Sequence, residues 1–336
     1  MKCRRFLPDL PNHIYQRSLN GTVIFYCLED CLVYFTVFCV SATKFGMTVL
    51  GLCEMYDHIH QLVAASDLRS LSGFERAVNI AFSREFFADL SQSPLGKEAC
   101  ALDGNIHSCQ SPPENIVIIP RCGHLLKSPF GSAPKVGEKA VRTCIAYLNN
   151  NPVERHIHNE AIKWRWNFLA YAFSDHPFSK KITIRKASVK LRRSLKEVEG
   201  CYARGGYLRH SQLRRMLSGL TAEEKNQLTD FIISTYNVIE YDRVASYYGS
   251  LEKMLAAINS NTGSEYDIRE ERHRNPDTAY GQMMKYVVKN EYVSSAKEVL
   301  LLPLGTKMSL KRILTCDTVA DEWQAMKFLG LGPAQK

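Results

Sequence analysis

Two histidines separated by a single residue, His58 and His60, constrain the fold of this chain more than any other feature. They lie in residues 52–63, LCEMYDHIHQLV, a segment rich in apolar side chains. Successive side chains of a β-strand point to opposite faces, so two residues at positions i and i+2 share a face. If this segment is a strand, both imidazoles project from one side of a sheet and form half of a metal site. The plainer alternative is two polar residues on a solvated strand face.

A second polar motif, YLNNNPVER, occupies residues 147–155. It ends a segment whose apolar residues recur at helical spacing, so we expect Tyr147 to lie on a helix. Asn151 follows Tyr147 by four residues, which allows both side chains to share one helix face. Because Pro152 disfavours the helical conformation of the residue before it, we expect the helix to end at Asn150 or Asn151.

In order and spacing, these two motifs resemble those of the single-tyrosine HUH transposases, and most closely those of the REP-associated tyrosine transposases. Further segments extend the resemblance over roughly residues 12–170: His13–Arg17, Ile24–Phe25, Asp30, Lys44–Met47, Leu71–Phe74, Phe82–Phe86 and Phe130–Lys135. The chain departs from the family at Tyr56, where a proline is usual, while Asp57 keeps the position that is commonly Asn, Asp or Glu. Residues 91–119 match the family poorly.

The resemblance implies an α+β fold. Residues 1–172 are expected to form an HUH nuclease domain, an antiparallel sheet with packed helices of the ferredoxin or RRM type. Residues 173–336 are expected to form a mainly helical, basic region that binds DNA. Whether the protein is a monomer or a homodimer stays open, because both occur among the proteins that this chain resembles.

The resemblance also implies the roles of the site residues. It assigns the metal ligands as His58, His60 and Asn151, and the nucleophile as Tyr147. Two imidazoles and one amide oxygen leave several positions open on a divalent ion, and such a site suits Mg²⁺ or Mn²⁺. Because of the proline, Asn149 or Asn150 remain alternatives for the third ligand. Asp57 is either a residue that orients a ligand or a simple turn residue.

The activity that the resemblance implies is that of a metal-dependent DNA transposase or nickase. Such an enzyme cuts and rejoins single-stranded DNA near hairpins through a covalent 5′-phosphotyrosine bond, leaving a free 3′-OH. The alternative is a catalytically inactive HUH-fold protein that binds nucleic acid. A third and unrelated alternative is a zinc protein with its ligands among Cys100, His107, Cys109, Cys122 and His124.

Positive charge supports a polyanionic partner, because the formal net charge is +9 and one basic run contains no acidic residue. The expected DNA contacts in this run are Lys180, Lys181, Arg185, Lys186, Lys190, Arg192 and Arg193. Outside the run we expect contacts from Gln16, Arg17 and Lys135, and the alternative for Gln16 and Arg17 is a place on the rim of the sheet. A solvated helix face is the alternative for the run. Four nearby aromatic residues are expected in the core rather than as a platform for bases: Trp164, Trp166, Phe168 and Tyr171.

No membrane partner is expected, because the longest apolar run, Leu32–Val40, is too short to cross a bilayer. The basic residues near the N-terminus are followed by prolines rather than by the apolar core of a signal peptide, so we expect a cytoplasmic protein. The chain contains 11 cysteines and no Cys-x-x-Cys pair, which favours neither a disulfide framework nor a zinc ribbon.

Periodicity predicts the main elements. Helices are expected over residues 28–45 and 70–92, and strands over 47–55 and along the histidine segment. Pro134 is expected to open the tyrosine helix, with Glu138 in its first turn. Residues 93–135 are expected to be mainly loop, with a short strand at 115–119. In the C-terminal half, Thr221 and Glu224 form a capping-box pattern. The segments 309–314 and 319–329 are expected to be helices that either read DNA as a helix-turn-helix or pack as a plain bundle.

Overall fold

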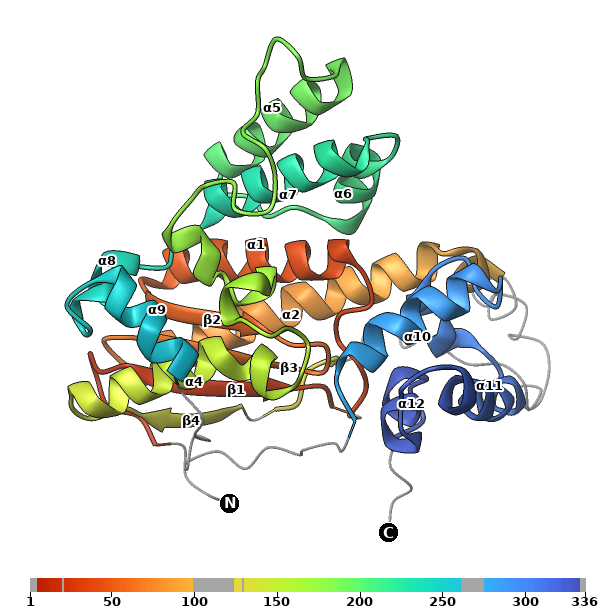
Figure 1. Ribbon diagram of the computed structural model, residues 1–336, viewed down its shortest axis with the longest axis horizontal. Coiled ribbons are helices and arrows are strands. Elements are labelled where there is room, and N and C mark those ends of the chain that lie inside the picture. The colour runs from red at the N-terminus through yellow and green to blue at the C-terminus, as the bar shows by residue number, and fades with distance from the viewer. Residues whose placement is uncertain (1–4, 20, 99–123, 129, 261–274, 333–336) are drawn as a thin grey trace.

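One four-stranded antiparallel sheet organises the N-terminal half (Figure 1). The computed structural model describes residues 5–19, 21–98, 124–128, 130–260 and 275–332. The sheet has the order β2-β3-β1-β4. Its strands are β1 (Asn12–Arg17), β2 (Thr48–Glu54), β3 (His58–Ala64) and β4 (Gly131–Pro134).

Helices cover both faces of this sheet. The helices α1 (Leu28–Phe45) and α2 (Leu68–Gln92) pack together on one face, where Gln61 of β3 donates a hydrogen bond to the Tyr34 hydroxyl of α1. The helix α4 (Glu138–Glu154) lies on the other face, with Leu148 packed close above Gly51 of β2. Polar side chains between the sheet and either helix layer are therefore removed from solvent.

The ends of α1 show why its predicted range is correct. At its start, one carboxylate oxygen of Asp30 accepts hydrogen bonds from the backbone N–H groups of Tyr26 and Cys27. At its end, Gly46 adopts the left-handed conformation with φ of 64°, which a residue without a side chain adopts at little cost.

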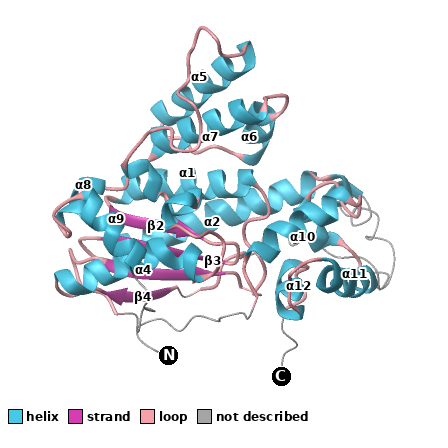
Figure 2. Ribbon diagram, viewed as in Figure 1, coloured by secondary structure: helices cyan, strands magenta, loops and turns pink. Residues whose placement is uncertain are grey.

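The rest of the chain is mainly helical (Figure 2). Its elements are η2 (Ala161–Lys163), η3 (Arg165–Asn167), η4 (Leu169–Ala172), α5 (Val189–Ala203), α6 (His210–Leu217), α7 (Ala222–Tyr236), α8 (Tyr241–Ser246), α9 (Leu251–Ser260), α10 (Thr278–Lys289), η5 (Ala296–Leu301), α11 (Leu304–Asp317) and α12 (Glu322–Phe328). The predicted capping box at Thr221 is confirmed, because Thr221 and Glu224 exchange hydrogen bonds at the start of α7. The molecule is thus α+β, as expected.

These helices form three groups around the sheet (Figure 1). The helices α5, α6 and α7 stand on the outer side of α1, and α8 and α9 lie beside α4. The last three helices lie beside the opposite end of the sheet, and the final two pack on each other. One buried apolar cluster runs through both halves of the chain, from Phe35 on α1 to Phe328 on α12. The domain boundary at 172/173 stays a prediction.

Two predictions of local structure are wrong. Pro134 ends β4 instead of opening the tyrosine helix, which begins at Glu138. Helix α4 also continues through Asn151 and Pro152 to Glu154. Proline removes a single N–H donor, and so close to the helix end the packing of α4 on the sheet outweighs that loss. Residues 115–119 lie outside the described residues. None of the helices described here has the length and apolar character needed to span a membrane.

Candidate functional site

The two histidines of β3 lie on the face of the sheet that α4 covers, and β1 adds two further rings beside them. The register pairs Tyr15 with His60 and His13 with Leu62. The ring of His60 lies 5.0 Å from that of His58, 5.1 Å from Tyr15 and 5.2 Å from His13, centroid to centroid. Both histidines of β3 are almost fully buried. The alternation of the strand thus gathers these four rings under α4.

Helix α4 brings the tyrosine motif to the same place. The Asn151 amide nitrogen lies 3.3 Å from His60 Nε2 and 3.4 Å from the Tyr147 hydroxyl. The ring of Tyr147 meets that of His60 edge-on, with centroids 5.5 Å apart. Asn151 and Tyr147 share a helix face, as their spacing predicts. Asn149 instead donates a hydrogen bond to the carbonyl of Ile145, within its own helix.

His58 is oriented by a chain of charged groups. Its Nδ1 lies 2.6 Å from an Asp57 carboxylate oxygen, and the other oxygen accepts a bond of 2.7 Å from Lys327 of α12. Burial alone would raise the pKa of Asp57, but His58 and Lys327 hold it well below its ordinary value. A carboxylate that accepts the Nδ1 proton leaves the lone pair of His58 on Nε2.

His60 is oriented in a similar way by a neutral partner. His60 Nδ1 lies 3.0 Å from His13 Nε2. Burial, together with His60 and Lys135 nearby, holds the pKa of His13 well below its ordinary value, so this ring is uncharged at neutral pH. A neutral imidazole accepts at one ring nitrogen. In the tautomer in which His13 Nε2 accepts from His60 Nδ1, the lone pair of His60 lies on Nε2, the atom that faces the Asn151 amide nitrogen.

Three buried polar atoms of this cluster have no hydrogen-bond partner within the described part of the chain: His13 Nδ1, and the two potential metal-ligand atoms His58 Nε2 and Asn151 Oδ1. Buried polar atoms are nearly always satisfied, so such atoms indicate a missing ligand or strain. The last two are of a kind that binds metal ions, and His60 Nε2 lies beside the same amide. The donor set therefore fits a divalent cation, with an amide rotation that turns Oδ1 toward the histidines.

A cavity of about 390 Å³ opens beside His58. Its wall includes the ring of Tyr15 and four cationic side chains: Arg17, Lys127, Arg155 and Lys327. Trp323 of α12 also lines it. The C-terminal helix thus forms part of a basic wall next to the histidines. Tyr147 does not line this cavity and is 3% exposed.

The predicted DNA contacts are only partly gathered at this cavity. Arg17 lines it, whereas Gln16 is buried and points to the α1 side of the sheet, where it donates a bond to the Lys127 carbonyl. Lys135 is buried near His13. The basic run lies in α5 and the loop before it, on the outer side of α1 (Figure 1), and all of its members except the half-buried Lys190 are exposed. The sheet and α1 separate this run from the cavity.

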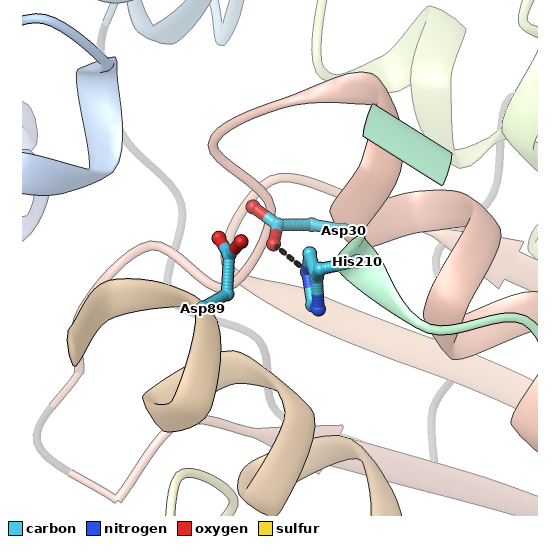
Figure 3. A group of neighbouring side chains, drawn as sticks. All are labelled: Asp30, Asp89 and His210. Carbon is cyan, nitrogen blue, oxygen red and sulfur yellow. Dashed lines mark hydrogen bonds and ion pairs between the residues drawn. The ribbon is translucent and has the colours of Figure 1, made fainter. Parts of the chain in front are cut away.

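Of the zinc alternative, Cys100, His107, Cys109 and Cys122 lie outside the described residues, and His124 is exposed. Another group could hold a metal by its geometry, since Asp30, Asp89 and His210 point toward one another (Figure 3). However, the Lys297 ammonium already lies among them. It donates to both carboxylates and lies 3.5 Å from His210 Nε2. We call Asp30, Asp89, His210 and Lys297 the clasp. It is an ion-pair network in which the lysine supplies the cation.

The sequence prediction missed His13, Tyr15 and the link from Asp57 to Lys327. Strand alternation was the available signal for the first two, because His13, Tyr15 and Arg17 must share a face if β1 is a strand. No local signal could have found Lys327, which is 270 residues from Asp57.

Comparisons of the chain with protein-family models, with curated proteins and with solved structures gave no match.

Proposed function

We propose that this protein is a metal-dependent DNA transposase or nickase, which cuts and rejoins single-stranded DNA through Tyr147. One observation carries the proposal. Two motifs far apart in the sequence converge on a single buried cluster, in which Asn151 lies within 3.4 Å of both His60 and Tyr147. The cationic cavity beside His58 supports a phosphodiester substrate.

The arrangement of the elements also supports an HUH domain of the ferredoxin or RRM type. The chain runs β1-α1-β2-β3-α2-β4, and the sheet order read from the other edge is β4-β1-β3-β2. This is the order of the split βαβ motif, with both helices on one face. The opposite face is then free for α4 and the catalytic groups.

In the proposed site, His58, His60 and Asn151 would hold Mg²⁺ or Mn²⁺. The bound ion supplies Lewis-acid polarisation of the scissile phosphate. Asp57 and His13 keep the two imidazoles in the tautomers that present Nε2. In the described conformation the Asn151 amide nitrogen donates to the Tyr147 oxygen, and the amide rotation that would present Oδ1 to the ion would release this bond and free the phenol.

The proposed step is a transesterification. The Tyr147 oxygen attacks phosphorus, so that a tyrosine O–P bond forms and the P–O3′ bond breaks. The phenol gives up one proton and the departing 3′ oxygen takes up one, so no net proton is consumed. Attack of a 3′-OH on the phosphotyrosine reverses the step and rejoins strands. Because Tyr147 is buried, its side chain or the end of α4 must move toward the cavity for the attack.

The test is covalent trapping. Wild type is incubated with Mn²⁺ and labelled single-stranded oligonucleotides that carry the hairpins found beside its gene, and adducts are separated on a denaturing gel. We expect an adduct that disappears in Tyr147→Phe, in His58→Ala and after chelation. Tyr202→Phe, an exposed tyrosine on α5, is the matched control and should keep the adduct.

Two outcomes would contradict the proposal. An adduct that persists in Tyr147→Phe would assign the chemistry to another residue. Binding of every hairpin without any adduct would favour the alternative, an inactive HUH-fold protein that binds nucleic acid.

A further inference from the structure

A second cavity, of about 410 Å³, lies on the other side of the turn between β2 and β3. Consecutive residues line the two cavities, since Tyr56 lines this one and Asp57 lines the basic one. The volume is in the range of small-molecule sites. None of the four proposed catalytic groups lines this second cavity.

One residue of the cavity wall, Glu54, carries a buried carboxyl. Glu54 is 1% exposed, and among the residues that the structure describes neither of its oxygens accepts from a nitrogen or hydroxyl donor. The polar side chain beside its carboxyl is the Cys31 thiol, a weak donor. Burial raises the pKa of this carboxyl well above its ordinary value, and the nearby Cys31 thiol offsets the rise only in part. A protonated carboxyl offers one donor and one acceptor. A ligand that offers one hydrogen-bond acceptor and one donor would therefore complement this carboxyl.

The remaining wall is aromatic and its mouth is basic. Tyr56 and Trp164 lie with their ring centroids 5.7 Å apart, and the Trp164 indole donates a hydrogen bond to the Glu54 backbone carbonyl. Trp166 is a further, partly exposed ring of the wall. Lys163 is an exposed cation that also lines the cavity. Rings, an edge-binding carboxyl and a cation together match a planar base attached to a phosphate.

We propose that this cavity binds one unpaired base of a single-stranded nucleic acid, stacked against its aromatic wall and hydrogen-bonded at its edge by Glu54. The edge of every nucleobase offers a donor next to an acceptor, which is the complement of a protonated carboxyl. This proposal rests on the proposed function, because the strand would pass over the β2–β3 turn to the basic cavity. The pocket would hold that strand in register with the histidine cluster.

The test measures binding without chemistry. Fluorescence anisotropy follows a labelled hairpin oligonucleotide with a single-stranded flank, in chelator, and a series in which each flank position is abasic in turn. We expect one position whose loss weakens binding by about 5- to 150-fold. Glu54→Leu should weaken binding of the intact oligonucleotide by a similar factor. It should not change binding of the oligonucleotide that is abasic at this position. Glu54→Gln, which keeps a donor and an acceptor, should restore most of the loss.

The variants are chosen so that folding does not decide the result. Glu54→Leu removes a buried carboxyl whose polar neighbour is only a thiol, a weak donor, so it is not expected to unfold the chain. Trp166→Leu is a second variant, at a partly exposed ring, and should show the same position dependence. Glu75→Gln changes a buried carboxyl of α2 that does not line the cavity and should bind like wild type.

Equal loss at every abasic position, or full binding of the intact oligonucleotide by Glu54→Leu, would overturn the base pocket, as would a failure of all oligonucleotides to bind. Titration with free nucleoside monophosphates tests whether the pocket instead serves free nucleotides. If these bind more tightly than the oligonucleotide, and if Glu54→Leu weakens that binding, the proposal that the pocket holds a base of a strand would also be overturned. Failure of the catalytic proposal is separate, because it appears as position-dependent binding without any Mn²⁺-dependent adduct.

Discussion

Two of the buried polar clusters among the described residues differ in how their polar groups are paired. In the clasp on the α1 side, Lys297 and Arg214 balance the carboxylates of Asp30 and Asp89 through direct ion pairs. His210 of the clasp binds Asp30 through Nε2, and its other ring nitrogen, Nδ1, has no partner among the described residues. In the cluster under α4, by contrast, the ligand atoms His58 Nε2 and Asn151 Oδ1 have no partner within the described chain. A network whose charges are paired indicates a structural role, whereas unpartnered ligand atoms indicate a site built for something to bind.

The largest expected effect is the loss of the lysine at the centre of the clasp. Lys297→Met should lower the free energy of unfolding by about 3–5 kcal/mol, because two buried carboxylates lose their shared cation. Denaturant unfolding at pH 7 measures this change. Lys311→Met, which removes a lysine paired with the exposed Glu322, is the control and should cost less than about 1 kcal/mol. Equal losses of unfolding free energy in the two variants would contradict a structural role for the clasp.

The cluster under α4 should behave in the opposite way. Without metal, Asn151→Leu should lower the free energy of unfolding by less than Lys297→Met does, since it removes an unpartnered oxygen and two long hydrogen bonds of the amide nitrogen, to His60 and Tyr147. Mn²⁺ at 100 times its Kd should stabilise wild type by about 2.7 kcal/mol and Asn151→Leu not at all. Thermal unfolding with and without Mn²⁺ measures both. A Mn²⁺ shift that survives in Asn151→Leu would exclude this residue as a ligand.

The link to the C-terminal helix should matter for metal affinity. Lys327→Met removes the cation that holds Asp57, which in turn orients His58. Outer partners of metal ligands typically contribute about 10- to 100-fold to affinity, so we expect a loss of that size in Mn²⁺ binding. Calorimetric titration measures it, and Lys307→Met on the neighbouring α11 is the control. An unchanged Kd for Mn²⁺ in Lys327→Met would show that Asp57 orients His58 without the ion pair to Lys327.

The smallest expected effect is a dependence on acid. Burial opposes ionisation of Asp30, but Lys297 and His210 hold its pKa well below its ordinary value. A depressed pKa gives stability that is present above the unfolded-state pKa of about 3.9 and is lost as the pH falls toward the folded-state pKa. Between about pH 5 and pH 3, wild type should therefore lose about 1–2 kcal/mol more than Asp30→Asn. Denaturant unfolding at each pH measures this difference. An equal loss of unfolding free energy in the two proteins across this range would contradict a depressed pKa for Asp30.

Patterns that depend on local physics were predictable from the sequence. The range of α1 follows from its apolar run and from the glycine after it, and the strand placement of the histidines follows from alternation. The shared helix face of Tyr147 and Asn151 follows from their spacing. The same rule of alternation should have separated Gln16 from Arg17, since neighbouring strand residues cannot both face the cavity.

What the sequence could not supply is contact between distant segments. The pairing of Lys327 with Asp57, and the position of Trp323 on the wall of the basic cavity, depend on how α12 returns to the sheet. The continuation of α4 through Pro152 has the same origin, because tertiary packing outweighs a local preference. The clasp joins four elements that share no motif, so the sequence contains no signal that links Asp30 to Lys297.

The most direct test of the account is the location of bound Mn²⁺. Electron paramagnetic resonance titration of free Mn²⁺ should show one site in wild type and in Asp30→Asn, and none in His58→Ala or Asn151→Leu. Circular dichroism confirms that each variant is folded. That result would place the metal under α4. Binding that persists in His58→Ala and disappears in Asp30→Asn would place it in the clasp and contradict the account.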